Sequence, residues 1–401
     1  MLHPLTHALR QRWLRFSSRP FWILTLLLAG SLAGLLSGCS LPQVKPEDRL
    51  FLPLSLEFVG SYTLPKQSFQ DTRVGGLSGL TYDRQRNQFY AVSDDRSDFA
   101  PARFYTLKMT LSPNSPEAIK SIELAGVTTL KSETGAAYAK GTVDLEGIAL
   151  SPRQTLFISS EGNTDQGIPP FVDEFDLTTG NWRSRLPIAT RYLPNAETQT
   201  GVQNNQGFES LALSAISPDP REPFRLFTAT ESALQQDLPE APADPAAPTP
   251  LRFLHYLIGE DQTLLISEHL YPLDPLPPGD QNLGLTDLLV LDQGGHFLGL
   301  ERGFGPGGFT IKMFQLATGG ATDISPLPRL SAGVEGIVPI QKRLLLDLSD
   351  LNIPLDNFEG LTFGPQFPDG SPSIIAVSDD NFNELQVTEF LLFRLKSGGA
   401  G

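Results

Sequence analysis

The stretch "VDLEGIALSPRQTLFISSEG", residues Val143–Gly162, contains two apolar segments joined by a turn with a proline. An acid lies beside each segment, Glu146 near the start of the first and Glu161 after the second. Short apolar segments bounded by turn residues are typical of paired β-strands. The stretch therefore predicts a β-hairpin with a carboxylate at the start of one strand and at the end of the other.

The same pattern occurs five times along the chain. Related segments begin at Gly75 ("GGLSGL"), Gln206 ("QGFESL"), Leu283 ("LGLTDL") and Asp356 ("DNFEGL"). Third strands are predicted around Arg103, Phe171, Arg252, Ile311 and Glu389, and fourth strands around Ser121, Arg185, Leu264 and Arg343. Repeated four-stranded units indicate a β-propeller, with a β-sandwich as the alternative. We predict an all-β propeller with five blades.

Two further segments bear on how the ring is completed. The stretch Ser325–Leu351 contains another "VEGI" segment from Val334, which leaves a sixth blade open. The fifth unit ends before a fourth strand, whereas "LSLEFVGSYTL", Leu54–Leu64, precedes the first unit. We expect this N-terminal strand to pair with the last blade and close the ring.

The N-terminal residues 1–38 have the pattern of an export signal. Four arginines precede the apolar run "FWILTLLLAGSLAGLL", Phe21–Leu36, which is short for a membrane span and suits a signal peptide. The run leads into "LSGC", which resembles the lipobox of bacterial lipoproteins and implies cleavage before Cys39 and lipidation of its thiol. By the same resemblance, Ser40 implies a cell-envelope protein anchored to the outer membrane, facing the periplasm or the cell surface.

The predicted organisation has four parts: a signal peptide (1–38), a linker after the lipidated cysteine (39–50), one propeller domain (51–396) and a C-terminal tail (397–401). Removing residues 1–38 would remove four arginines and no acid, and would change the formal net charge from −15 to −19. Such a charge argues against binding nucleic acid or an anionic membrane surface. We expect a monomer that contacts the membrane through its lipid alone.

The acids of the repeat predict a cation site. In a propeller, equivalent positions of successive blades face the same axis, and crowded carboxylates repel one another or bind a cation. Oxygen ligands in flexible geometry suit Ca²⁺. The predicted ligands are Glu146, Glu209, Asp287, Glu359, Asp379 and Asp380. The alternative is that these acids cap turns or bond neighbouring backbone amides.

Several motifs also resemble a known family. The segments "GGLSGL", "DLEGIAL", "DNFEGLTFGP" and "VSDDNFNELQVTEFLLFRL" resemble the bacterial phytase-like family, whose description is esterase-like activity of phytase. The resemblance extends over roughly Leu54–Leu395 and is most specific from Asp356 onward. It implies an exported β-propeller, phosphoester hydrolysis and, by relation to alkaline phytases, dependence on calcium.

The first functional hypothesis is a metal-assisted hydrolase of a small phosphoester or another ester. Glu161 or Glu301 would take the proton of a bound water, and Arg96 and Arg302 would contact the phosphate at the same mouth. Further cations placed by the repeat to contact substrate are Arg103, Arg252 and Lys312. The arginines can equally serve to balance the neighbouring acids.

Two other functions remain open. The first is a lactonase or carboxyl esterase on a propeller, and the second is a lipoprotein of the envelope that binds a partner without catalysis. The sequence lacks the motifs of serine hydrolases, zinc peptidases and P-loop proteins. The polar clusters "SDDRSD", Ser93–Asp98, and "SDDNFNE", Ser378–Glu384, belong to the first and last units, so we expect them to meet in the closed ring.

Overall fold

The computed structural model describes residues 50–112, 118–238, 247–330 and 336–398. The predicted signal peptide, Cys39 and residues 40–49 of the predicted linker lie outside these ranges, as do Val334 and the last three residues of the tail. In the described part of the chain, no helix is both long and apolar enough to span a bilayer.

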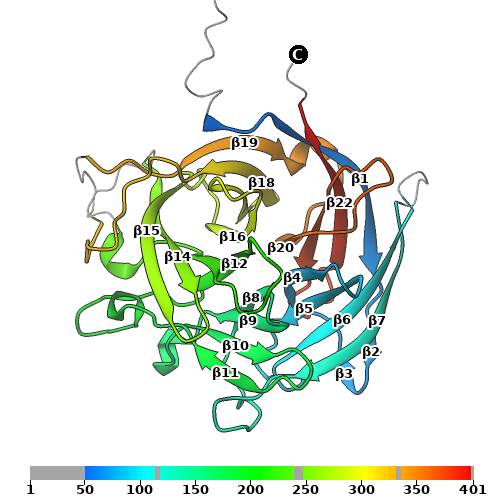
Figure 1. Ribbon diagram of the computed structural model, residues 1–401, viewed down its shortest axis with the longest axis horizontal. Coiled ribbons are helices and arrows are strands. Elements are labelled where there is room, and N and C mark those ends of the chain that lie inside the picture. The colour runs from blue at the N-terminus through cyan, green and yellow to red at the C-terminus, as the bar shows by residue number, and fades with distance from the viewer. Residues whose placement is uncertain (1–49, 113–117, 239–246, 331–335, 399–401) are drawn as a thin grey trace, which may run out of the picture. The chain divides into compact units, whose positions relative to one another are not determined.

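Five four-stranded antiparallel sheets form a ring (Figure 1). From the inner to the outer strand, blade one contains β4 (Leu77–Asp83), β5 (Gln88–Ser93), β6 (Arg103–Leu111) and β7 (Ile119–Thr129). Blade two contains β8 (Leu145–Leu150), β9 (Thr155–Ser160), β10 (Phe171–Asp176) and β11 (Trp182–Arg185). Blade three contains β12 (Phe208–Ser214), β13 (Phe224–Thr230), β14 (Thr249–Ile258) and β15 (Thr263–Leu273).

Blade four contains β16 (Asn282–Val290), β17 (His296–Gly305), β18 (Gly308–Ala317) and β19 (Gln341–Asp347). Blade five contains β20 (Asn357–Phe363), β21 (Ser373–Asp379), β22 (Thr388–Ser397) and β1 (Leu54–Leu64). The prediction of an all-β propeller with five blades is confirmed. Among the described residues, the stretch Ser325–Leu351 supplies β19 and the short 3₁₀ helix η4 (Leu348–Leu351) to blade four, and no sixth four-stranded sheet is present.

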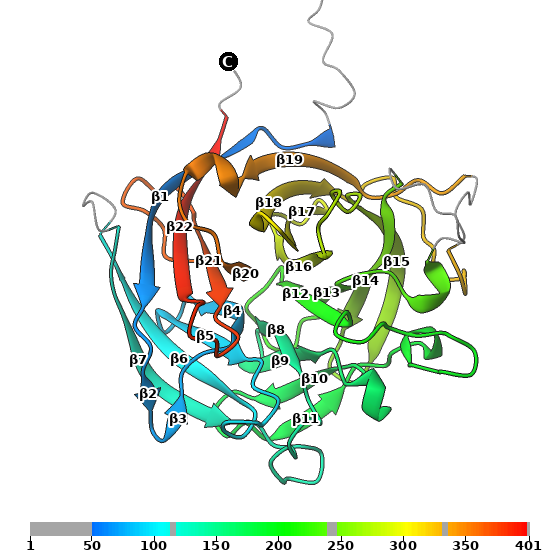
Figure 2. The same ribbon diagram turned by 180° about the vertical axis from the view of Figure 1, so that it is seen from behind.

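Blade five joins the two ends of the propeller. Strand β1 pairs antiparallel with β22, from Leu54 opposite Ser397 to Leu64 opposite Thr388. Figure 2 shows the same arrangement from behind, with β1 and β22 side by side. The remaining elements are the short hairpin β2 (Ser68–Phe69) and β3 (Thr72–Arg73) and the 3₁₀ helices η1 (Thr164–Gln166), η2 (Thr190–Tyr192) and η3 (Gln235–Asp237).

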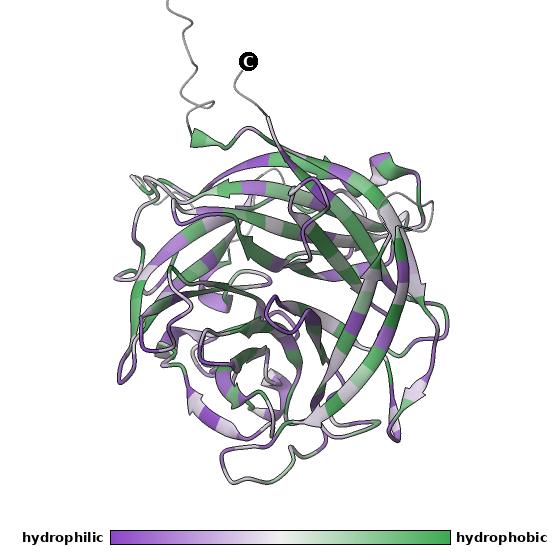
Figure 3. Cartoon of the chain, turned by 45° about the vertical axis from the view of Figure 1, so that its right-hand side comes forward, coloured by the Kyte–Doolittle hydropathy of each residue, from purple (hydrophilic) through white to green (hydrophobic). Residues whose placement is uncertain are grey.

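The apolar residues of the repeat fill the spaces between blades. Five hydrophobic clusters are present, and each combines side chains of two consecutive blades, including the pair formed by blades five and one. Phe157 of blade two, for example, packs edge-on against Phe224 of blade three. Figure 3 shows the apolar residues concentrated along the strands, whereas the loops are mostly polar. Burial between blades thus holds the five inner strands β4, β8, β12, β16 and β20 around one axis.

Candidate functional site

Every inner strand carries a β-bulge near its start. The regular pairing with the second strand is interrupted between Leu77 and Gly79, and at the matching place in the other four blades. A bulge turns a side chain away from the regular alternation of a strand. The residues at this position, which we call the bulge ring, are Ser78, Glu146, Glu209, Thr286 and Glu359.

A second ring comes from the ends of the second strands. The residue before the bulge pairs with Ser93, Ser160, Thr230, Glu301 or Ser378, depending on the blade. The next residue along each second strand forms what we call the strand-end ring, which consists of Asp94, Glu161, Glu231, Arg302 and Asp379. Four of its five members are acids, and the fourth blade alone supplies an arginine.

The two rings meet at one end of the axis. A cavity of about 450 Å³ there is lined by Glu146, Glu209 and Glu359 of the bulge ring and by Asp94, Arg302 and Asp379 of the strand-end ring. The rest of its lining is Arg96, Asp144, Asn205, Asn282, Phe304, Phe309, Asn357, Asn381, Asn383 and Gln386. We call this cavity the polar mouth. Besides the acids and Arg302, seven of the lining side chains carry an amide or guanidinium group. This lining suits a polar ligand.

Burial and mutual repulsion disfavour the charged form of the acids. Burial raises the pKa of Glu146 and Glu209 well above the usual range, and neighbouring carboxylates raise it further. The same two causes, with burial the larger, raise the pKa of Asp94 to about 8. The pKa of Glu359 is raised to about 7, also mainly by burial, although Arg302 opposes the shift. The polar mouth therefore attracts cations strongly.

Two arginines compensate part of this charge. The Arg302 Nη2 atom lies 2.9 Å from Glu359 Oε1 and 3.4 Å from Glu231 Oε1. These carboxylates raise the pKa of Arg302 despite its burial, so the guanidinium remains charged. Arg96 pairs with Asp144 and also donates to Asn205 Oδ1. Two cations against this number of acids leave the mouth with a surplus of carboxylates.

Two groups of acids have the geometry of a metal site. The first is Asp144, Glu146 and Glu161, and the second is Glu161, Glu209 and Glu231. In each group, one oxygen from every carboxylate lies within 4.8 Å of the others, and all members are buried. An all-oxygen donor set of this kind fits a hard cation such as Ca²⁺ better than a thiophilic or imidazole-binding metal. Glu161 belongs to both groups and is the central acid of the site.

Four of the six predicted metal ligands reach the polar mouth: Glu146, Glu209, Glu359 and Asp379. Asp380 instead serves the joint between blades five and one, where its Oδ1 accepts from the Gly76 amide at 2.9 Å. At this joint the rings of Phe99 and Phe382 lie 4.8 Å apart, so the loops after β5 and β21 lie side by side as expected.

Asp287 has a different place from the one its alignment with the other acids predicts. It follows the bulge residue Thr286, because blade four begins its motif one residue earlier than "EG" suggests. Its carboxylate accepts from the Leu361 amide at 2.6 Å and from the Leu288 amide at 2.8 Å. Burial raises the pKa of Asp287 to about 8. This acid bridges two inner strands and does not line the polar mouth.

The same shift of one residue separates Glu301 from Arg302. Glu301 pairs with Leu285, as Ser160 pairs with Leu145, and its side chain leaves the axis. Glu301 Oε1 accepts from the Tyr271 hydroxyl at 2.7 Å and from Lys342 at 2.5 Å. The structure therefore brings Glu161, Arg96 and Arg302 to the site, and directs Glu301 to the outer part of its blade.

The three cations predicted to bind substrate lie elsewhere. Arg103 is fully buried, with its Nη1 2.6 Å from Asp95 Oδ2. Arg252 is likewise buried, in ion pairs with Asp237 and Glu268. Lys312 pairs in register with Glu301 and Asp347 in the middle of blade four. All three belong to third strands, and none of them lines the polar mouth.

Sequence reasoning missed several members of the site. Asp144 directly precedes "LEGI" and was not considered, although it lines the cavity and belongs to a candidate metal group. Asn282 and Asn357 line the cavity just before or at the start of the inner strands of blades four and five. A signal was present, because the residue before the strand-start motif is polar in some units and glycine in others.

The fold and the axial cavity define the class: a five-bladed β-propeller whose polar mouth is lined by carboxylates. The family model Phytase-like, described as "Esterase-like activity of phytase", matches residues 72–382. The chain therefore belongs to the phytase-like family, and the resemblance found in the sequence is confirmed. Curated proteins give no match.

Several solved structures are similar over most of this chain. An endo-arabinase from Bacteroides thetaiotaomicron is 9% identical, with a TM-score of 0.41 and coverage of 81% of this chain and 96% of that one. A thermostable family-43 glycoside hydrolase is 10% identical, with a TM-score of 0.45 and coverage of 84% and 94%. Regucalcin from Agrobacterium tumefaciens, described as a calcium-binding protein, is 11% identical, with a TM-score of 0.35 and coverage of 81% and 93%. At these scores the likenesses carry no argument about function.

Proposed function

We propose that the chain is an exported, calcium-dependent hydrolase of phosphate esters whose site is the polar mouth. The observation that carries this proposal is the pair of buried acid groups that share Glu161. Three of their members, Asp144, Glu146 and Glu209, line the polar mouth together with Arg96 and Arg302. Membership of a family described by esterase-like activity of phytase supports hydrolysis of an ester. A bound cation would also neutralise part of the negative charge of the mouth and so allow an anionic substrate to bind.

The proposed calcium ligands are the acids of the two groups. Asp144, Glu146 and Glu161 would hold one ion, or Glu161, Glu209 and Glu231 would hold it on the other side of Glu161. Bound Ca²⁺ would supply positive charge for the phosphate oxygens and for a water molecule. Glu161 is fixed for this role, because its Oε1 accepts from the Gly207 amide at 2.5 Å.

The two arginines would orient the phosphate. Arg302 lies at the wall of the cavity, where its charge is retained and its Nε has no hydrogen-bond partner within the described residues. Arg96 is half-exposed at the rim and can turn toward a ligand. Guanidinium groups donate two parallel hydrogen bonds to phosphate oxygens, which fixes the orientation of the ester.

Asp94 has the properties of the group that would accept the proton of a water. It lines the cavity, and in the part of the chain that the structure describes its Oδ1 has no hydrogen-bond partner. Its pKa, raised to about 8, suits an acid–base group that works near neutral pH. Of the two acids that the sequence suggests for this role, we propose Glu161 as a calcium ligand instead, and Glu301 does not line the polar mouth.

The location of the protein is part of the proposal. The basic and apolar N-terminal segment and Cys39 support export and attachment by a lipid. A Cys39→Ala variant should move from the membrane fraction to the soluble fraction after cell lysis. Retention of the variant in the membrane fraction would show that something other than the lipid holds the protein there.

The proposal is tested on the domain from residue 40 onward, which contains all five hydrophobic clusters. Calcium binding is measured by calorimetry, and hydrolysis is measured on a panel of phosphate monoesters, carboxylate esters and lactones. Calcium binding with turnover of phosphate esters is expected, and Glu161→Gln should weaken calcium binding at least tenfold and lower turnover with it. If only lactones or carboxylate esters are hydrolysed, the substrate is one of these and not a phosphate ester. Calcium binding without any turnover would favour a binding protein.

A further inference from the structure

A second cavity lies at the opposite end of the propeller axis. The inner strands run from the polar mouth to this end, and their later residues line a cavity of about 410 Å³. Among its lining residues are Leu80–Tyr82, Ile148–Leu150, Leu211–Leu213, Leu288–Val290 and Leu361–Phe363. We call this cavity the apolar mouth. It has no residue in common with the polar mouth, so the two are separate binding spaces.

The alternation of the strands builds this cavity in layers. Side chains two residues apart on a strand point to the same side. The deeper layer is buried and wholly aliphatic, and it consists of Leu80, Ile148, Leu211, Leu288 and Leu361. The layer nearer to solvent is half-buried, and it consists of Tyr82, Leu150, Leu213, Val290 and Phe363. Two successive rings of apolar side chains thus form a bowl at the end of the axis.

Asp287 does not line this bowl but is bonded to the backbone of two residues that do. Its carboxylate accepts from the amides of Leu288 and Leu361, whose side chains belong to the deeper aliphatic layer. These hydrogen bonds tie blades four and five together between the two mouths.

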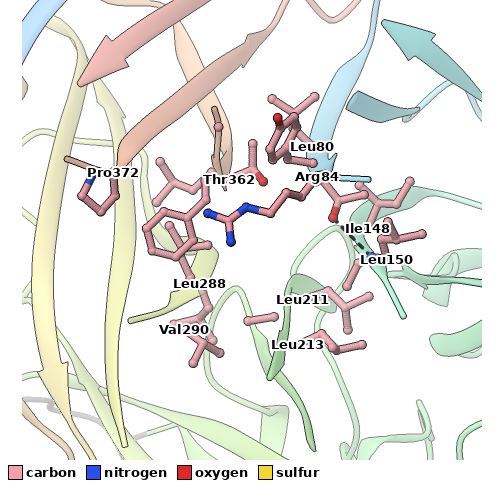
Figure 4. Close-up of a pocket in the computed structure, with 18 of the residues that line it drawn as sticks. Leu80, Arg84, Ile148, Leu150, Leu211, Leu213, Leu288, Val290, Thr362 and Pro372 are labelled. Atoms are coloured by element: carbon pink, nitrogen blue, oxygen red, sulfur yellow. Dashed lines mark hydrogen bonds between the residues drawn. The ribbon is translucent and has the colours of Figure 1, made fainter. Parts of the chain in front are cut away.

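One charged side chain enters the bowl. Arg84 is the only charged residue among those that line the apolar mouth in the described part of the chain. Figure 4 shows its guanidinium near the centre of the cavity, surrounded by Leu80, Leu288, Leu211 and Thr362. Within the described residues, Arg84 makes no ion pair, whereas the neighbouring Asp83 is engaged by Arg86 at 2.6 Å. The bowl thus offers an apolar surface with a single free positive charge.

We infer that the apolar mouth binds a small amphiphilic carboxylate, of the kind represented by a free medium-chain fatty acid. The hydrocarbon chain lies on the two apolar layers, and the carboxylate pairs with the Arg84 guanidinium. The volume of the bowl falls in the range of small-molecule sites, which suits a compact ligand. This inference does not depend on calcium or on hydrolysis at the polar mouth.

The test measures binding of octanoate, decanoate and dodecanoate to the domain from residue 40 onward by calorimetry in EDTA. Affinity should rise about fourfold for each added methylene until the bowl is full. Arg84→Gln should weaken the affinity for decanoate roughly tenfold, because a hydrogen bond between two charged groups is lost. Arg84 is exposed, so the substitution should leave the fold intact. Leu213→Asn should weaken binding through loss of apolar surface while retaining the charge.

Two controls separate this site from others. Arg183→Gln removes an exposed arginine of the outer strand β11 and should leave decanoate binding unchanged. Glu161→Gln should also leave it unchanged, which distinguishes failure of this inference from failure at the polar mouth. The inference is overturned if no carboxylate binds at millimolar concentration, or if Arg84→Gln and Leu213→Asn bind like the unaltered domain. It is also overturned if sedimentation shows a dimer that these substitutions dissociate, because the bowl would then be an interface between copies.

Discussion

At the scale of the residue, Glu161 is the acid on which the candidate metal site depends. It belongs to both groups of close carboxylates, and it is buried at the end of β9. Replacing it by glutamine keeps the shape but removes one negative ligand from either group. We therefore expect Glu161→Gln to weaken calcium binding at least tenfold in a calorimetric titration.

The matched control is Glu301→Gln, which alters a buried acid at nearly the same position of another repeat. Its carboxylate is bonded to Tyr271 and Lys342, away from the polar mouth. Calcium affinity should stay within twofold of the unaltered domain, although some stability is lost with the ion pair. Equal losses of calcium affinity in both variants would show that the two groups around Glu161 are not the site.

Arg302 provides a second prediction at this scale. Because it occupies the acid position of the strand-end ring, Arg302→Gln removes the cation that neutralises Glu231 and Glu359. The affinity for calcium should stay the same or rise, because the substitution leaves more negative charge in the mouth. The KM for a phosphate ester should increase about tenfold, because a guanidinium that binds phosphate is lost. Measuring both quantities on one preparation checks this, and a parallel loss of calcium binding would mean that the substitution damages the whole mouth.

The residues of the site mark the limit of what the sequence could predict. Glu146, Glu209 and Glu359 were found because each acid occupies the same place in its motif. In blade four the motif "LTDL" has its acid one place later than in the other blades. Aligning acid with acid therefore assigns Asp287 to the bulge position, which Thr286 occupies. It likewise assigns Glu301 to the strand-end position, which Arg302 occupies. Only the hydrogen-bond register of β16 and β17 resolves this, because a shift of one residue turns a side chain to the other face.

At the scale of the element, the glycines before the inner strands make room for the strand-end acids. Gly284 precedes the bulge of β16, and an added Cβ atom there would overlap the Glu231 side chain. Gly284→Ala must displace that acid, at a cost of roughly 1–3 kcal/mol in the free energy of unfolding. We expect a lower melting temperature together with weaker calcium binding.

Gly319→Ala is the matched control, because an added Cβ atom at this position meets nothing within 4 Å. Its melting temperature and calcium affinity should equal those of the unaltered domain. If Gly284→Ala behaves in the same way, then Glu231 is not held in the position that the structure gives it.

The elements themselves were largely predictable. Apolar segments with turns between them marked the first three strands of each blade, because these strands are buried between neighbouring sheets. The outermost strands carried a weaker pattern: β19 and β15 consist mostly of half-buried and exposed residues. The third-strand arginines Arg103 and Arg252 do not line the cavity, contrary to the prediction. A sequence repeat gives the position of a residue along its strand but not the distance of its side chain from the axis.

At the scale of the whole molecule, the crowded acids make stability depend on pH. In the folded state the pKa of Asp94 is raised to about 8 and that of Glu359 to about 7, whereas both are near 4 in an unfolded chain. Between about pH 4 and pH 8 the folded state therefore binds more protons, and the free energy of unfolding falls as the pH rises. In EDTA, the melting temperature should drop by several degrees over this range.

Calcium should reverse this loss. An ion bound only by the folded state stabilises it by about 2.7 kcal/mol at a hundred times its dissociation constant. Because the ligands must lose their protons, the gain should be larger at pH 8 than at pH 5. Melting curves with and without millimolar Ca²⁺ at both values check this, and magnesium serves as the control cation. A melting temperature that neither pH nor calcium alters would mean that the acids are paired in ways that need no cation.

The pairing of β1 with β22 also has a consequence for how the ring is assembled. Leu54 lies opposite Ser397 in the register of β1 and β22, so the first strand of the propeller leaves the ribosome long before its partner. Until then β1 has no partner strand, and blade five lacks its outermost strand. Contacts this distant in sequence slow folding, so we expect the final step to wait for the complete chain. Loss of the last ten residues would remove the part of β22 that pairs with Leu54–Gly60 of β1. A chain shortened at its C-terminus would therefore expose an unpaired edge made of its N-terminal residues.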